Sequence, residues 1–432
     1  MTQPSGGRRR AARRSLLPGV PGIPAAGARR RSVRSRHTTP AARLLLAALG
    51  LLGVAALVAV AVLWPDRSGV QALQRKAEFA PTGTTYVEAR LTERTDTTAD
   101  GQQGSVVVLH DGPDAGRHVT VTLPRADQRS ALGAGDTVVL ARTPAASDAA
   151  ATYTFFAVSR GPSLWLLAAL FVVVLVAVAR WRGVMALVGL AVAGAMLWWF
   201  VVPAMLVGHH PALVALAGAA VILFVVLYTT HGVRPTTSAA LAGTLGGVGI
   251  TVGLATWAVH ATRLNGVTGD AGSALLSYAP DVAFPGLLVA GVVIAGLGVL
   301  NDVTITQASA VYELRAASPT ARRVDVLGAA MRIGRDHIAS TVYTIVFAYA
   351  GTALLTLMVI RLYAQPAGLL ISTEDLAEEV VRTLVSSVGL ILAVPLTTVI
   401  AALVADTAGD SHGHSHGHAH GRAQGHEPTR LA

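Results

Sequence analysis

LLLAALGLLGVAALVAVAVLW, residues 44–64, is a run of 21 residues without a charged side chain. About 20 apolar residues are enough to cross the roughly 30 Å hydrocarbon core of a bilayer. A secretory signal would have a shorter apolar core, of about 7–15 residues, followed by a small-residue cleavage site. This run ends instead in Trp64-Pro65-Asp66, so we interpret it as a first transmembrane helix that acts as a signal anchor.

Further apolar runs follow, and none of them contains Asp, Glu, Lys or Arg. The chain is 52% hydrophobic and only 13% charged, whereas soluble domains carry about 25% charged residues. We therefore predict a membrane all-α bundle of about eight transmembrane helices, with a seven-helix membrane domain at 163–405. The seven runs are Ser163–Ala179, Val184–Gly208, Pro211–Thr230, Thr236–His260, Val282–Leu300, Ile338–Ile360 and Thr383–Ala405.

The segment between the first two apolar runs, residues 66–160, has a different pattern. Short strand-like runs alternate with clusters of Gly, Pro and Asp, which is typical of a small all-β domain. We predict five strands and an OB-like barrel, with too few aromatic residues for a nucleic-acid platform. The expected strands are Thr85–Leu91, Ser105–His110, His118–Leu123, Asp136–Ala141 and Thr152–Val158.

Arginine counts predict the orientation. With the N-terminus inside, the inner segments hold 21 Arg and the short outer loops hold 3, in agreement with the positive-inside rule. Both termini are then cytoplasmic, the β-domain is extracytoplasmic, and Arg234 in the turn before Pro235 reports topology. Residues 1–43 contain 11 Arg and are predicted to be a disordered cytoplasmic arm that could also bind anionic lipids.

The densest polar sequence adjoins the sixth and seventh spans. Carboxylates close to hydrocarbon are costly and usually functional, so these residues are candidates for a polar path or ion site. Alternatively, Asp302 caps a helix and Asp336 pairs with Arg332, Arg335 or Arg315. Val324, Leu327, Met331 and Ile338 recur at helical spacing and predict an amphipathic helix leading into the seventh span. The candidates are Asn301, Asp302, Thr304, Thr306, Gln307, Asp336, His337, Ser340, Thr341 and Thr344.

Three strings carry a family resemblance: GVLNDVTITQASAVYEL at 298–314, RDHIASTVYT at 335–344 and AYAG at 348–351. They resemble the signature of the YibE/F-like family of bacterial multi-pass membrane proteins. The resemblance extends from about the β-domain to Ala405 and excludes the Arg-rich arm and the tail. It implies a multi-pass protein of the bacterial cell membrane, but it implies no substrate, because the biochemical function of the family is not established.

The C-terminal segment 411–432 is rich in histidine. Neutral imidazole binds zinc, nickel and copper, so we expect weak zinc or nickel binding by this cytoplasmic tail, although such tracts also arise as low-complexity sequence. The chain has no cysteine, which excludes disulfides and thiolate metal sites. The metal candidates are His412, His414, His416, His418, His420 and His426.

Two classes of function remain open. The sequence contains no nucleophile motif, phosphate loop or dinucleotide fingerprint, so we expect neither an enzyme nor a required cofactor. The first hypothesis is a permease-like protein that moves an ion or small solute. The second is a non-transporting scaffold or sensor whose outer β-domain binds an envelope protein. The sequence predicts the lipid bilayer as a partner, excludes nucleic acid and leaves the oligomeric state open.

Overall fold

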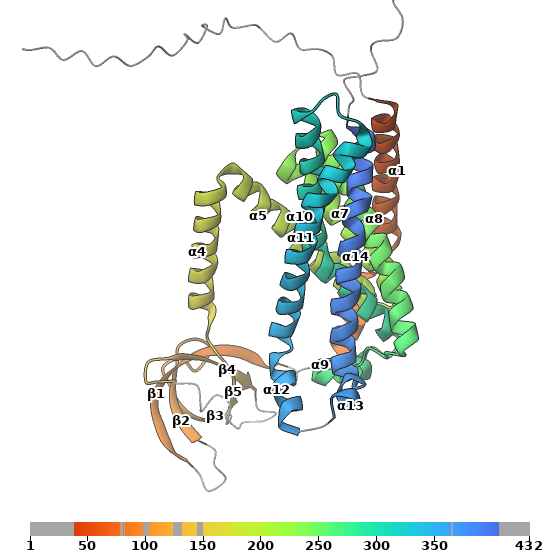
Figure 1. Ribbon diagram of the computed structural model, residues 1–432. Coiled ribbons are helices and arrows are strands. Elements are labelled where there is room, and N and C mark those ends of the chain that lie inside the picture. Colours follow the sequence, from red (N-terminus) through yellow and green to blue (C-terminus); the bar gives the residue numbers. More distant parts are fainter. Residues whose placement is uncertain are drawn as a thin grey trace, which may run out of the picture. The chain divides into compact units, whose positions relative to one another are not determined.

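The computed structural model describes residues 39–77, 81, 83–97, 103–123, 132–144, 150–363 and 366–405 (Figure 1). The predicted His-rich tail and all but the last residues of the predicted arm lie outside the described residues. The described chain is mostly helical, with one small antiparallel sheet between the first helices.

Seven of the described helices are long and apolar enough to cross a membrane, and each matches a predicted span. Continuous apolar sequence favours this outcome, because a helix satisfies its own backbone hydrogen bonds in lipid. The helices are α1 (Pro40–Val62), α4 (Gly161–Ala179), α5 (Trp181–Met196) with its continuations η1 (Leu197–Val201) and α6 (Val202–Leu206), α7 (Pro211–His231), α8 (Pro235–Thr262), α10 (Phe284–Ala317) and α14 (Glu374–Val404).

The predicted span Ile338–Ile360 is not a single straight helix. Helix α11 (Arg323–Thr352) and helix α12 (Leu354–Tyr363) meet at an angle of 64°, and they make an eighth span only if they are counted together. Gly351 lowers helix propensity at this point. The Thr352 hydroxyl also donates to the Tyr349 carbonyl at 2.8 Å, a local bond that competes with the helix ladder.

Three shorter helices were not predicted: α2 (Arg67–Lys76), α9 (Gly269–Tyr278) and α13 (Ala367–Ile371). Helix α2 occupies the start of the segment that we assigned to the β-domain. Its signals were present in the sequence, because the Asp66 side chain accepts a hydrogen bond from the Ser68 amide and Arg75 and Lys76 lie in the last turn. An acidic cap and basic last-turn residues both favour a helix.

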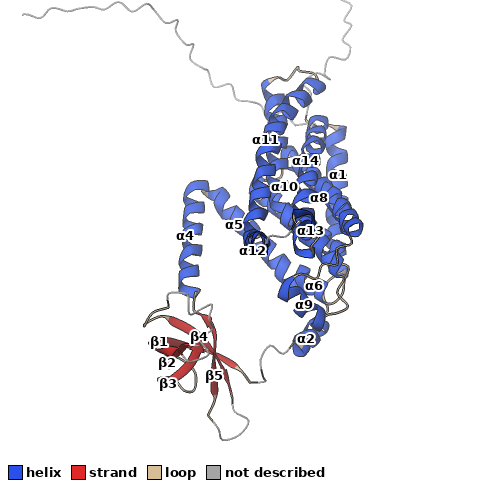
Figure 2. Cartoon of the chain, turned by 60° about the horizontal axis from the view of Figure 1, so that its bottom comes forward, coloured by secondary structure: helices blue, strands red, loops and turns tan. Residues whose placement is uncertain are grey.

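All five predicted strands are present, as β1 (Thr85–Thr97), β2 (Gln103–Leu109), β3 (His118–Leu123), β4 (Thr137–Thr143) and β5 (Thr152–Val158) (Figure 2). They form one antiparallel sheet in the order β3-β2-β1-β4-β5. The edge strands β3 and β5 also contact each other, so the sheet curls into a half-barrel. Val87, Leu109, Leu123 and Leu140 fill its interior.

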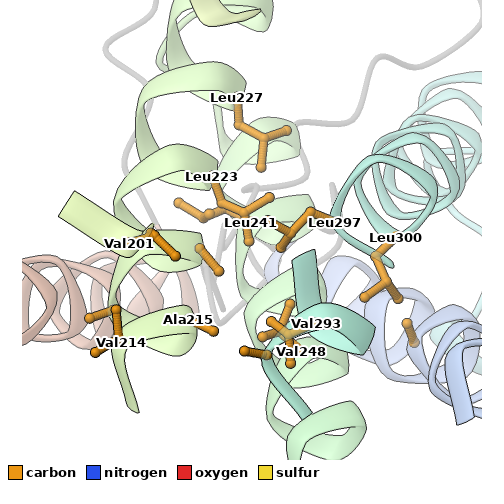
Figure 3. Close-up of a cluster of buried hydrophobic side chains, with 14 of the residues drawn as sticks. Val201, Val214, Ala215, Leu223, Leu227, Leu241, Val248, Val293, Leu297 and Leu300 are labelled. Carbon is orange, nitrogen blue, oxygen red and sulfur yellow. The ribbon is translucent and has the colours of Figure 1, made fainter. Parts of the chain in front are cut away.

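The largest helix contacts join α8, α10 and α14, and we call these three helices the α8–α10–α14 unit. Leu241 and Val248 of α8 and Leu300 of α10 belong to the buried cluster around it, which extends to Leu223 on α7 (Figure 3). Glycine lets the helices approach closely. A Cβ added at Gly243 would lie 2.0 Å from the Thr397 Oγ1, and small residues of this kind are typical of interfaces between membrane helices.

Candidate functional site

Thr304 and Gln307 of the predicted polar cluster are buried where α10 meets its neighbours. The Thr304 hydroxyl lies 2.6 Å from the Thr244 hydroxyl on α8. The Gln307 side-chain amide donates to the Thr398 hydroxyl on α14 at 2.7 Å and to the Ala330 carbonyl on α11 at 3.0 Å. These bonds tie four helices together, and both side chains therefore contribute to packing.

The other candidates from the sequence lie on more open faces. Among their hydroxyls, those of Thr306, Thr341 and Thr344 donate to carbonyls four residues earlier in their own helices, at 2.7, 2.8 and 3.1 Å. The structure thus distributes the predicted cluster over several environments and does not gather it at one point. Asp302, Asp336, His337, Ser340 and Thr344 are exposed, and Asn301, Thr306 and Thr341 are half-buried.

The structure contradicts the alternative roles expected for the two carboxylates, a helix cap for Asp302 and an ion pair for Asp336. Asp302 lies inside the continuous helix α10 and caps no helix. Asp336 forms no ion pair with any described residue. Arg315, one of its expected partners, donates instead to the Ala321 carbonyl at 2.7 Å. The sequence placed both carboxylates at the ends of apolar runs, but helices α10 and α11 continue beyond those runs, so both residues lie inside helices.

A cavity of about 310 Å³ lies between α5, α7 and α10. Aliphatic side chains and two glycines, Gly189 and Gly298, form most of its wall. Asn301 also lines it, and the Asn301 Oδ1 is buried without a hydrogen-bond partner among the described residues. Buried polar atoms are nearly always paired, so this amide is available to a solute or a water molecule.

A second cavity, of about 440 Å³, lies further along the same helices and is bounded by the start of α8 as well. Its wall is more polar than that of the first cavity. Arg182 of α5, His231 at the end of α7 and Arg234 at the start of α8 supply nitrogen groups, and Glu313 of α10 supplies a carboxylate. Arg182 and Arg234 are both close enough to His231 to act on it electrostatically.

The two cavities follow each other along one seam. On α10 their lining residues are Ile294, Leu297, Gly298 and Asn301, then Ile305, Ser309, Tyr312 and Glu313. These residues recur every three or four positions, so they share one face of the helix. The lining residues of α5 and α7 also continue from one cavity to the next. We call this line of space the α5–α7–α10 seam.

Local sequence explains the charges at the Arg182 end of the seam. Helices α4 and α5 are separated by Arg180 alone, with φ 54°. The next turn of α5 packs so closely on α4 that a Cβ at Gly183 would lie 2.7 Å from the Leu175 carbonyl oxygen. Gly232, with φ 76°, ends α7, and Arg234 follows it as the N-cap of α8. Two tight turns thus place two cations beside one cavity.

A larger groove, of about 850 Å³, lies between α1, α7 and α8. Its wall is aliphatic, with Leu52, Leu216 and Leu245 among the lining residues, and it offers no polar chemistry. The described residues contain no group of three or more His, Cys, Asp or Glu side chains that could hold a metal ion. The predicted metal ligands of the tail lie outside those residues.

Sequence reasoning missed the seam, although its signals were present. Arg180 and Arg182 were counted only among the 21 inner arginines, and Arg234, in the His231-Gly-Val-Arg234 turn, was interpreted only as a reporter of topology. They lie about 50 residues apart along the chain, and only the packing of α5 against α7 brings them together. Among the residues that the polar-cluster argument selected, Asn301 alone lines the seam.

Comparison with known proteins identifies a family. The family model described as YibE/F-like protein matches residues 167–407, more than half of the chain. The match begins within α4 and therefore covers the helices of the seam but not the β-domain, which we had expected it to include. No curated protein and no solved structure matches the chain.

Proposed function

We propose that this chain, which belongs to the YibE/F-like protein family, is a permease-like membrane protein that moves a small solute or ion along the α5–α7–α10 seam. The observation that carries the proposal is the succession of two cavities on the same faces of three membrane-length helices. On α10 the lining runs from Ile294 to Glu313. At ~1.5 Å per residue this covers about 28 Å of the axis of α10, and on α7 the lining runs from Ile222 to His231, the half of that helix nearer α8.

Two further features support movement through the seam. Asn301 offers a buried, unpaired oxygen part of the way along it, where a dehydrated solute would need a hydrogen bond. The π-helix η1 lies at the opposite end from Arg182, and its first residue, Leu197, lines the first cavity. Single π-helical turns inside α-helices occur frequently at functional sites. Under the positive-inside rule the Arg182 end faces the cytoplasm.

The test uses two glycines at which an added side chain meets open space. Gly298 lines the first cavity of the seam, and Gly249 lines the aliphatic groove beside α1. A Cβ at either position would meet no heavy atom within 4 Å. Gly298→Leu should therefore block the seam without disturbing helix packing, whereas Gly249→Leu should add the same bulk elsewhere.

Purified wild-type protein and both variants would be placed in liposomes and screened for flux of small cations, anions and metal ions. We expect flux of at least one solute from wild type and Gly249→Leu, and background flux from Gly298→Leu. Equal flux from all three proteins would contradict the seam as the path. Absence of flux across the whole screen would contradict the permease-like function.

One observation favours the second hypothesis, a scaffold or sensor whose β-domain binds an envelope protein. Tyr86 of β1 and Phe156 of β5 are each 47% exposed, with ring centroids 4.7 Å apart. Exposed aromatic pairs are typical anchors of protein interfaces. The strand order and the curled sheet also suit the OB-like barrel predicted for this domain.

Crosslinking in intact cells should recover a partner from wild type but not from the double variant Tyr86→Ser, Phe156→Ser.

A further inference from the structure

We propose that the second cavity, at the Arg182 end of the seam, binds a phosphate-class anion, either inorganic phosphate or the phosphate of a lipid headgroup. This inference rests on the proposed function for the role of the site, because it names the solute class that the seam would admit. Binding itself can be measured whether or not a solute crosses the membrane.

The first argument is electrostatic. Arg182 is the second residue of α5, and Arg234 is the N-cap of α8. Helix N-termini carry partial positive charge and favour anions, so a cation there is locally unfavourable. Among the described residues, neither N-cap side chain, that of Arg180 for α5 or of Arg234 for α8, makes a capping hydrogen bond. Two cations and two helix N-termini thus meet at one cavity, and a bound anion would satisfy all four.

The second argument is the set of unpaired hydrogen-bonding groups. Thr237 lines the cavity, is only 1% exposed and makes no side-chain hydrogen bond with any described residue. The Thr230 hydroxyl is also buried without a partner among the described residues. In contrast, Thr229 and Thr244, which neighbour them on α7 and α8, donate to carbonyls of their own helices at 2.7 and 2.8 Å.

The first turn of α8 adds backbone donors. Pro235 is the first residue of the helix, and the amides of Thr236 and Thr237 follow it. These amides have no carbonyl four residues earlier within the helix to bond. Phosphate presents several acceptor oxygens at once, which suits a site built from helix-terminal amides, hydroxyls and arginine.

Two features oppose an anion and limit its affinity. Glu313 lines the same cavity, and the last turn of α7 brings the negative end of a helix dipole to it. Two arginines against one carboxylate still leave the ionised side chains positive. A competing carboxylate is also useful for the test, because its neutralisation should change binding in the opposite direction to the loss of an arginine.

Both sources of phosphate can reach the site. Trp181, which also lines the cavity, is 70% exposed, and tryptophan favours the interface between hydrocarbon and headgroups. A headgroup phosphate could enter from the bilayer, and free phosphate could enter from water. The group that is recognised, a phosphate, is the same in both cases, so the experiment has one arm for each source.

In the first arm, inorganic phosphate is titrated into the full chain in a neutral detergent, by calorimetry and by melting temperature. We expect saturable stabilisation of wild type. The dissociation constant should rise about tenfold in Arg182→Gln and in Arg234→Gln, since each loses a charged hydrogen-bond donor. Glu313→Gln should tighten binding, and Arg335→Gln, which removes an exposed cation on α11, should leave it unchanged. Variants are compared only if their melting temperatures match wild type without phosphate.

In the second arm, the chain is placed in phosphatidylcholine nanodiscs with or without phosphatidylglycerol. Stabilisation by phosphatidylglycerol that is lost in the double variant Arg182→Gln, Arg234→Gln assigns the site to a lipid headgroup. Stabilisation by inorganic phosphate alone assigns it to a free anion.

The proposal is overturned if neither source stabilises wild type, or if Arg335→Gln weakens binding as much as the seam variants do. Phosphate binding without flux would support the anion site and contradict the proposed transport function. If the double variant binds no phosphate but still shows flux of an anion, the result would contradict the anion site and support the permease-like function.

Discussion

Helix α10 takes part in two interfaces of opposite character. Toward α8 and α14 it presents Leu300, Thr304 and Gln307, which are buried against neighbouring side chains. Toward α5 and α7 it presents Gly298 and Asn301, which line a cavity. Neighbouring residues in sequence, such as Leu300 and Asn301, therefore have opposite environments, because successive positions point in different directions around a helix.

Glycine shows the difference most clearly. In the α8–α10–α14 unit, Gly243 and Gly389 are each opposed by a threonine of the facing helix, and an added Cβ would lie 2.0 and 2.1 Å from the threonine Oγ1. In the seam, an added Cβ at Gly298 would meet no heavy atom within 4 Å. Glycine thus brings helices together in one interface and leaves space in the other. This difference distinguishes the packed α8–α10–α14 unit from the candidate path in the seam.

The largest effect is expected where glycine and threonine are in closest contact. Gly243→Ala would place a methyl group against the Thr397 Oγ1 and 3.1 Å from its Cα, so the backbones of α8 and α14 must separate. We expect the free energy of unfolding to fall by about 1–3 kcal/mol, seen as a lower melting temperature in detergent. Gly253→Ala on the same helix meets open space and should be neutral or stabilising by up to ~1 kcal/mol. Equal melting of the two variants would contradict the packed character of the unit.

A smaller effect should distinguish the two amides of α10. Gln307→Leu removes the bonds to Thr398 and Ala330 and should cost roughly 0.5–1.5 kcal/mol. Asn301→Leu removes a side-chain oxygen without a partner among the described residues, so it should leave stability unchanged or raise it. Thermal unfolding of both variants measures the difference, and a larger loss in Asn301→Leu would show that the seam is packed in a way that the cavities do not indicate.

The smallest effect concerns pH and uses the β-domain as a contrast to the packed unit. The Tyr153 hydroxyl donates to the Asp114 carboxylate at 2.5 Å, and Arg117 and Arg142 also pair with it. The Tyr153 bond and then the Arg117 bond hold the pKa of Asp114 below its usual value. Its stabilising contribution is therefore present above the unfolded-state pKa and is lost as the pH falls through the lower folded-state value.

Hydrogen exchange of β3 and β5, compared between wild type and Asp114→Asn at each pH, measures that contribution. The protection of the wild type should approach that of the variant as the pH falls. The polar contacts that join α8, α10 and α14 are between neutral hydroxyl and amide groups, so their protection should not depend on Asp114. A pH-independent difference between the two proteins in β3 and β5 would contradict a charge-based role.

Much of the element list could be predicted from the sequence. Apolar runs such as Leu44–Trp64 matched helices, and the short strand-like runs at 85–158 matched the five strands. Helix ends were less predictable, because α10 continues for 17 residues beyond its apolar run, from Leu300 to Ala317. Polar residues can extend a helix beyond the bilayer, so hydropathy alone does not mark its end. The break between α11 and α12 depended on local hydrogen bonding at Thr352.

The candidate site could be predicted only in part. Density of polar residues selected 301–307 and 336–344, but it could not tell a hydroxyl that bonds to its own helix, such as that of Thr341, from one that faces another helix, such as that of Thr304. The arginines of the seam were visible as charges. Their convergence with His231 was not, because it depends on the rotation of α5 about its own axis.

The sequence by itself determined which segments of the chain become membrane-length helices and which become a sheet. A long apolar segment in lipid must satisfy its own backbone hydrogen bonds, and this leaves the helix as the solution. Only the tertiary structure decided which helix faces meet, which glycines are in close contact with a facing helix and where space remains. The contacts that decide this join residues far apart in the chain, with 60 positions between Thr244 and Thr304 and 91 between Gln307 and Thr398, and no local pattern of the sequence encodes such pairs.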